Sequence, residues 1–225
     1  MSGKPTKRNY DATSRRAAAA ATRERICAAA ETLFLRDGYA RTSVRAVAKA
    51  AGVAEATMYL AFTDKPALLD AVILRAVRDN PSEALDAIAA APTPDVLPRL
   101  AASNAALMKR AGRLIALGES ASLMDAELRP FRDQAQGRLR TAFRAIADRL
   151  DAEGVLRLSA EEAADTLYAI AGEGTYLRMT EGAGLSAARY AEWLADTLSA
   201  VLLVPARLTG RDSARAALGR ARGAL

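Results

Sequence analysis

The groups that could do chemistry in these 225 residues are carboxylates, lysines and tyrosines, because the sequence contains no histidine and a single cysteine. Histidine is the commonest general base and a common zinc ligand. An enzyme would have to use carboxylates such as Glu173 or Asp165, and no paired carboxylate, nucleophile with a base, or phosphate-binding loop accompanies them. We therefore expect no catalytic residue, no metal site and no cofactor.

The single cysteine, Cys27, excludes an intramolecular disulfide. It falls within an apolar stripe at helical spacing, where a small hydrophobic side chain is ordinary. We predict a core residue, and a redox sensor is the alternative.

Charge is distributed unevenly along the chain, whose formal net charge is +6. Residues 1–65 carry 12 Lys and Arg against 6 Asp and Glu, residues 66–204 carry 15 against 19, and residues 205–225 carry 5 against 1. Two basic ends around an acidic body favour a nucleic-acid-binding module joined to a part that does not touch nucleic acid.

Composition indicates an all-α fold. Only 5% of residues are aromatic while Ala, Leu, Arg and Glu dominate, a mixture that favours helices over strands. No apolar run approaches the roughly 18 to 20 residues that span a bilayer, and the N-terminus lacks the apolar core of a secretory signal. We expect a cytoplasmic protein that does not enter the membrane.

Turn residues and apolar periodicity divide the chain into four parts. We predict a flexible basic arm (1–16), a basic DNA-binding domain (17–65), a larger helical domain (66–204) and a basic tail (205–225). The arm could enter a minor groove or only solubilise the protein, and for the tail a solvated segment is favoured.

The predicted DNA-binding domain has a helix-turn-helix pattern. A helix over about Ala17–Arg36 stops at Gly38, a short helix capped by Thr42 or Ser43 stops at Gly52, and a third helix covers Glu55–Ala61. Asp64 then caps a helix that runs to about Asp79 and joins the two domains. Two short helices joined by a turn with glycine are typical of this motif.

Four pieces of residues 26–70 together resemble the DNA-binding module of the TetR (tetracycline-repressor) family. They are Phe34–Tyr39, Thr42–Val53, Thr57–Phe62 and Thr63–Leu69. The resemblance implies an all-α transcriptional regulator with an N-terminal three-helix DNA-binding domain and a C-terminal helical domain (66–204) for ligand binding and dimerisation. Its implied partners are double-stranded operator DNA, a second copy of the chain in a homodimer, and an unknown small-molecule effector.

The second helix of such a motif enters the major groove. Here Glu55, Ala56, Thr57 and Tyr59 would face DNA, while Val53, Met58 and Phe62 would face the core. By resemblance the phosphate contacts are Thr57, Tyr59 and Lys65, with Thr42 or Ser43 and Arg45 nearby.

Three features of this helix are unusual for the family that it resembles. Ala54 stands where a capping serine is common, and Ala61 stands where a histidine is frequent, so no operator sequence can be carried over. Glu55 could accept from a cytosine amino group, although a solvated charge that complements the helix dipole is favoured.

The last two predicted helices cover about Ala160–Thr180 and Ser186–Val204. The final helix carries two apolar stripes, as expected of a helix that packs on two sides, and Gly172 and Gly174 would allow close approach. We therefore predict that these helices form the dimer interface through Leu167, Ala171, Gly174, Trp193, Leu194, Leu198 and Val201.

Polar residues interrupt apolar faces of the second domain. A buried polar group needs a partner, which could be a ligand, another side chain or water. The predicted pocket comprises Asn104, Met108, Met124, Phe131, Phe143, Tyr168 and Tyr176.

The resulting hypothesis is a repressor that a small, mainly apolar ligand releases from a palindromic operator, with the helix from Asp64 to Asp79 transmitting the change. The alternatives are a DNA-binding regulator or architectural protein without ligand sensing, and an enzyme. Specific binding of duplex DNA by residues 1–65 would separate the first two classes from the third.

Overall fold

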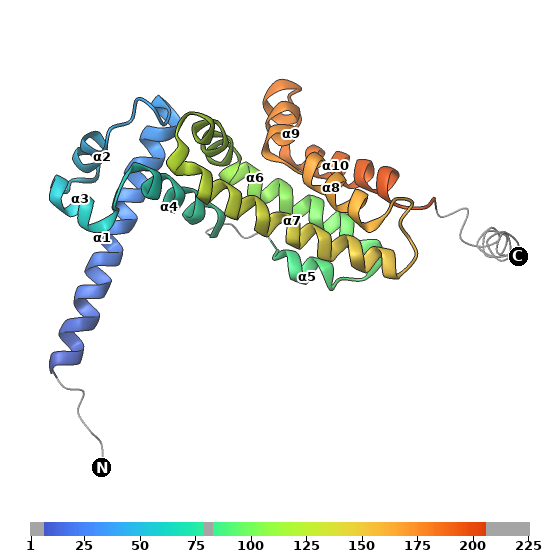
Figure 1. Ribbon diagram of the computed structural model, residues 1–225, viewed down its shortest axis with the longest axis horizontal. Coiled ribbons are helices and arrows are strands. Elements are labelled where there is room, and N and C mark those ends of the chain that lie inside the picture. The colour runs from blue at the N-terminus through green and yellow to red at the C-terminus, as the bar shows by residue number, and fades with distance from the viewer. Residues whose placement is uncertain (1–6, 79–82, 206–225) are drawn as a thin grey trace, which may run out of the picture. The chain divides into compact units, whose positions relative to one another are not determined.

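The computed structural model describes residues 7–78 and 83–205, and within these ranges it contains helices and no sheet (Figure 1). The all-α prediction is confirmed. The chain divides into two compact units, Met1–Asn80 with Arg110–Gln134, and Pro81–Lys109 with Ala135–Leu225. Among the described residues no helix has the length and apolar character needed to span a membrane.

The first unit is built around one long helix. Helices α2, α3 and α4 all contact α1 (Figure 1). The unit comprises α1 (Lys7–Asp37), α2 (Val44–Ala51), α3 (Glu55–Ala61), α4 (Lys65–Arg78), the second half of α6 (Thr93–Met124), η1 (Ala126–Leu128) and the start of α7 (Arg129–Ala152).

Helix α1 begins ten residues earlier than predicted, at Lys7. The expected flexible arm is therefore wrong for residues 7–16, while residues 1–6 lie outside the described part of the chain. The apolar stripe, which begins only near Ile26, gave no sign of this extension. Residues 14–21 are exposed, and a helix on the surface can rest on the propensity of its alanines without burying a face. The predicted basic tail also falls outside the described residues, apart from Pro205.

The core of the first unit is apolar and takes residues from every one of its main helices. The fully buried side chains include Ile26, Phe34, Val47, Met58, Leu68, Leu69 and Val72. Cys27 lies in this core, where burial raises the pKa of its thiol. A buried thiol with a raised pKa is a poor nucleophile, which supports the structural role over the redox sensor.

The second unit surrounds a separate apolar core. Its elements are α5 (Leu85–Ala89), the first half of α6, most of α7, α8 (Ala160–Ile170), α9 (Glu173–Leu177), the π-helix η2 (Arg178–Gly182) and α10 (Ala187–Leu202). Buried leucines and isoleucines fill the core: Leu97, Leu100, Ile146, Leu150, Leu167, Leu194 and Leu198.

The helix predicted over residues 160–180 is interrupted. α8 ends at Ile170, and Gly172 adopts an extended backbone conformation (φ −78°, ψ 160°) as the N-cap of α9. Glycine costs about 1 kcal/mol relative to alanine in a helix interior, and two glycines stand at positions 172 and 174. These glycines, predicted to allow close helix packing, coincide with the break.

Candidate nucleic-acid interface

Local hydrogen bonds set the turn between α2 and α3. The Ser43 hydroxyl accepts from the backbone N–H of Ala46 at 3.1 Å, which caps α2. Gly52 ends α2 in the left-handed conformation with φ 66°, where a side chain would be strained. The predicted second helix, its cap and its glycine stop are confirmed.

Thr42 is not available at the surface. Its side chain is buried, and its hydroxyl donates to the carbonyl of Gly38 at 2.8 Å and lies 3.3 Å from the carbonyl of Leu33. The interpretation of Thr42 as a phosphate contact is therefore wrong in this conformation. The exposed Ser43 is the remaining candidate of the two.

The predicted orientation of α3 agrees with the structure. Met58 and Phe62 are buried, Val53 and Thr57 are half-buried, and an exposed face carries Glu55, Ala56 and Tyr59. The expected loss of a cap is also found, because Ala54 makes no side-chain hydrogen bond to the helix. Contact of these exposed residues with DNA stays a prediction.

Sequence reasoning missed Leu60 on the same helix. Its side chain is 88% exposed, the most exposed among the large hydrophobic residues of the described chain. The helical pattern assigns the neighbouring Met58 and Phe62 to the core, so Leu60 could have been recognised as the apolar residue left on the outer face.

Glu55 is paired with a cation. Its carboxylate lies 3.3 Å from Nε of Arg45, and both side chains are exposed. The pair joins α2 to α3 across the turn. It is a third role for Glu55, besides the cytosine contact and the solvated charge considered from the sequence. A surface ion pair of this kind contributes little stability, about 0 to 1 kcal/mol. Its consequence for DNA is that the charge of Glu55 is partly offset.

Lys65 is held by two consecutive residues that follow α1, Tyr39 and Ala40. Its ammonium lies 4.1 Å from the centre of the Tyr39 ring and 3.4 Å from the carbonyl oxygen of Ala40. The Tyr39 hydroxyl donates to the carboxylate of Asp125 at 2.8 Å. Partial burial lowers the pKa of Lys65, and the negative charge of Asp125 opposes that shift.

Tyr39 is consequently the link between a predicted DNA contact and the segment that follows α6. Burial and the hydrogen bond to Asp125 raise the pKa of the Tyr39 hydroxyl, so it stays protonated and donates. Asp125 also caps η1 by accepting from the backbone N–H of Glu127 at 3.0 Å. Tyr39 and Asp125 are 86 residues apart in sequence, and no pattern in the sequence indicated that they meet.

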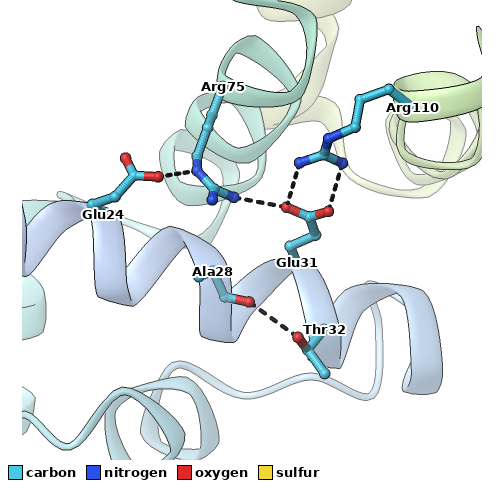
Figure 2. Close-up of polar contacts among 6 residues, drawn as sticks. All are labelled: Glu24, Ala28, Glu31, Thr32, Arg75 and Arg110. Carbon is cyan, nitrogen blue, oxygen red and sulfur yellow. Dashed lines mark hydrogen bonds and ion pairs between the residues drawn. The ribbon is translucent and has the colours of Figure 1, made fainter. Parts of the chain in front are cut away.

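An ion network ties α1 to α4 and α6 within the same unit (Figure 2). The two oxygens of Glu31 accept from Arg110 at 2.7 and 3.2 Å, and one of them also accepts from Arg75 at 2.7 Å. Arg75 also donates to Glu24. Glu31 and Arg75 are only 17% and 18% exposed, so these contacts are better shielded from solvent than ordinary surface pairs.

Comparison with known families decides the class of this module. Residues 26–72, which contain α2, the turn and α3, match the model of a family described as bacterial regulatory proteins, tetR family. Residues 26–72 are therefore similar to the DNA-binding module of this family, which confirms the resemblance found in the sequence.

Solved structures have a fold similar to that of most of this chain. One similar structure is described as a transcriptional regulator from Saccharomonospora viridis in complex with choline, with 22% identity, 83% of this chain and all of that chain covered, and a TM-score of 0.66. A complex of SmeT with triclosan has 22% identity, 83% and 93% coverage and a TM-score of 0.66.

A third similar structure is NalD, described as the secondary repressor of the MexAB-OprM multidrug efflux pump in Pseudomonas aeruginosa. It has 21% identity, 81% and 96% coverage and a TM-score of 0.63. At these identities the likeness concerns the fold. Among curated protein sequences no significant match is found.

The residues predicted to line the ligand pocket are divided between the two units. Met124 and Phe131 belong to the first unit, whereas the other five residues belong to the second. Met124 is 76% exposed, so the structure contradicts its assignment to a pocket lining. It follows Leu123, also exposed, at the end of α6, directly after the buried residues Ala121 and Ser122.

The polar residues of the second unit have partners within the protein. Asn104 donates to the carbonyl of Ala171 at 2.8 Å and accepts from the Tyr190 hydroxyl at 3.1 Å. Tyr176 packs edge-on against Tyr190 with ring centres 4.9 Å apart. Of the alternatives left open for Asn104, a protein partner is therefore the one found.

Three further pocket candidates lie in different surroundings. Met108 and Phe143 are buried in the core of the second unit. Tyr168 is half-buried, with the guanidinium of Arg140 4.0 Å from its ring centre. A ligand contact for any of them stays a prediction.

Burial divides the residues predicted at the dimer interface into two groups. Leu167, Ala171, Leu194 and Leu198 are buried within one chain, so this conformation offers none of them to a partner, and their assignment is wrong. Gly174 and Trp193 are half-buried, and Val201 is exposed. Of the two apolar stripes on α10, the one with Leu194 and Leu198 faces the core and the one with Trp193 and Val201 is the outer one.

Proposed function

We propose that the protein is a cytoplasmic repressor that binds a palindromic operator as a homodimer and leaves it when a small, mainly apolar ligand binds. The observation that carries the proposal is the exposed face of α3, which follows a capped α2 and a glycine turn, together with the supported ammonium of Lys65 in the same unit. In a helix-turn-helix protein such a face enters the major groove while nearby cations contact phosphates.

Selection of bound sequences from random duplex DNA tests the operator. We expect a palindrome with half-sites about 34–36 Å apart and two chains per duplex, because one short helix contacts too few bases. Affinity should exceed that for random duplex by ~10³ or more. Equal affinity for random DNA would instead indicate an architectural DNA-binding protein.

The phosphate contact is tested by Lys65→Ala. We expect affinity to fall at least about tenfold for operator and random duplex alike, with a salt slope smaller by about 1, because a phosphate contact carries no sequence information. Lys109→Ala is the matched control, because Lys109 is an exposed lysine of the second unit. It should leave the affinity and the salt slope unchanged. Fluorescence anisotropy at several salt concentrations measures the effect. Unaltered binding by Lys65→Ala would contradict the docking model.

The outer stripe of α10 supports a homodimer. Trp193, Thr197 and Val201 lie one turn apart along the helix and are half-buried to exposed. An apolar stripe of this kind on the outer side of a helix is suited to packing against a second copy. The proposed interface therefore moves from the buried leucines to this stripe, and sedimentation of the free protein reports the oligomeric state.

The division of α6 between the two units supports ligand control. Residues 93–109 of this helix belong to the second unit, while its later turns and Asp125 belong to the unit that carries α3. In that unit α6 lies close to α4, since a Cβ built at Gly118 would be 2.7 Å from Cδ1 of Ile73. We infer that the signal travels along α6 as well as along α4, the helix expected to transmit it.

Triclosan and choline are suitable probes because structures of similar fold contain them. The apolar core of the second unit favours triclosan. If triclosan acts as the ligand, it weakens operator binding by some factor, and operator DNA must weaken triclosan binding by the same factor. We expect a factor of about 5 to 150, which corresponds to a coupling free energy of ~1–3 kcal/mol. Calorimetric titration with and without operator measures this factor. Equal affinities in the two titrations would remove the probe from consideration.

A further inference from the structure

The outer face of α3 lacks the side chains that most often distinguish guanine and adenine. From Ala56 to Thr63 it has no charged residue and no amide side chain. Arginine and lysine are the usual partners of guanine, and asparagine and glutamine are those of adenine. Glu55, the only charged residue of the helix, is paired with Arg45. Direct contacts of α3 with bases must therefore come mainly from hydroxyl and apolar groups.

Two apolar side chains occupy the exposed face. Ala56 and Leu60 are four residues apart, so they lie on the same side of the helix one turn from each other. Both are exposed, and Leu60 leaves almost its whole side chain in water. The core does not explain this exposure, because Met58 and Phe62 fill the inward positions of the same helix.

The thymine methyl group is the apolar feature that a base pair presents in the major groove. From this match we propose that Leu60, with Ala56 beside it, determines sequence preference by covering thymine methyl groups in each half-site. The inference rests on the proposed function, because it requires α3 to enter the major groove of a specific operator. The neighbouring Tyr59 is also exposed, and its hydroxyl would contact a phosphate of the DNA backbone instead of a base.

Replacement of single thymines by deoxyuridine in the selected operator tests the proposal, since it removes one methyl group and preserves base pairing. For the wild-type protein we expect at least one position per half-site where this change lowers affinity about fourfold, and roughly 15-fold when both half-sites are changed. Leu60→Ala should bind the unmodified operator more weakly and be indifferent to deoxyuridine at that position.

Leu123→Ala is the matched control, because Leu123 is also highly exposed but lies at the end of α6. It should keep the wild-type response to deoxyuridine. Melting curves of Leu60→Ala should match those of the wild type, since an exposed side chain contributes little to the core.

Two results would overturn the proposal. One is an operator for which deoxyuridine changes nothing in the wild type, and the other is a Leu60→Ala variant with the wild-type response at every thymine. Either result leaves specific DNA binding intact and rejects only the role of Leu60. Failure to enrich any sequence would reject the proposed function itself, and the role of Leu60 with it.

Discussion

Glu31→Gln is expected to lower the stability of the first unit by about 2 kcal/mol, because charge-assisted hydrogen bonds in a shielded site are worth more than exposed pairs. The glutamine keeps the shape of the side chain but removes the charge that meets both Arg75 and Arg110. Arg75 retains its contact with Glu24. The melting temperature should fall by roughly 4 to 8 °C, as measured by calorimetry.

Glu192→Gln provides the matched control for this substitution. Glu192 pairs with Arg189 on the surface of α10, where the two side chains are 59% and 74% exposed. Removing such a pair should change stability by no more than about 0.5 kcal/mol. Equal shifts in the two variants would show that the network around Glu31 contributes nothing beyond an ordinary surface pair.

The elements of the DNA-binding module could be predicted because local interactions define them. Ser43 caps the helix that follows it, Gly52 occupies a left-handed turn, and Asp64 accepts from the backbone N–H of Ala67 at 2.7 Å to start α4. Each of these contacts lies within a few residues of sequence. Residue type and spacing therefore determine them almost alone.

Contacts between distant segments could not be predicted in the same way. Glu31 is 44 residues from Arg75 and 79 from Arg110, and a sequence with 26 acidic and 32 basic residues offers many other pairings. The two stripes of α10 show a related limit. Periodicity revealed that both faces are apolar, but only the packed fold shows which of them, with Leu198, faces the core.

The site itself was predicted in outline and incompletely in detail. The pattern placed Glu55, Ala56 and Tyr59 on the exposed face of α3, as the structure has them. It did not separate the buried Thr42 from the exposed Ser43, because either residue can cap a helix. Nor could it show that the ring of Tyr39, one of the residues that carry the family resemblance, packs against the ammonium of Lys65.

That support leads to a prediction in which the sign of the effect is informative. Asp125 is acidic and belongs to the unit that contains α3, so a purely electrostatic account expects its removal to strengthen DNA binding. The structure favours the opposite result. Asp125 fixes the Tyr39 hydroxyl at 2.8 Å, and the Tyr39 ring lies 4.1 Å from the ammonium that we expect to contact phosphate.

Asp125→Ala should therefore weaken binding of operator and random duplex by roughly fivefold, about 1 kcal/mol, because Lys65 loses a fixed support. Tyr39→Phe should also weaken DNA binding. The double variant should bind DNA no more weakly than the single variant of lower affinity, because both substitutions break the same Tyr39–Asp125 hydrogen bond. Glu127→Ala is the charge-matched control, because Glu127 is an exposed carboxylate two residues away, and its removal should leave affinity unchanged or slightly raised. Anisotropy titrations below the melting temperature of every variant measure these affinities. If Asp125→Ala strengthened binding as Glu127→Ala does, Asp125 would act only through its charge, and the link from the end of α6 through Tyr39 to Lys65 would have no part in holding DNA.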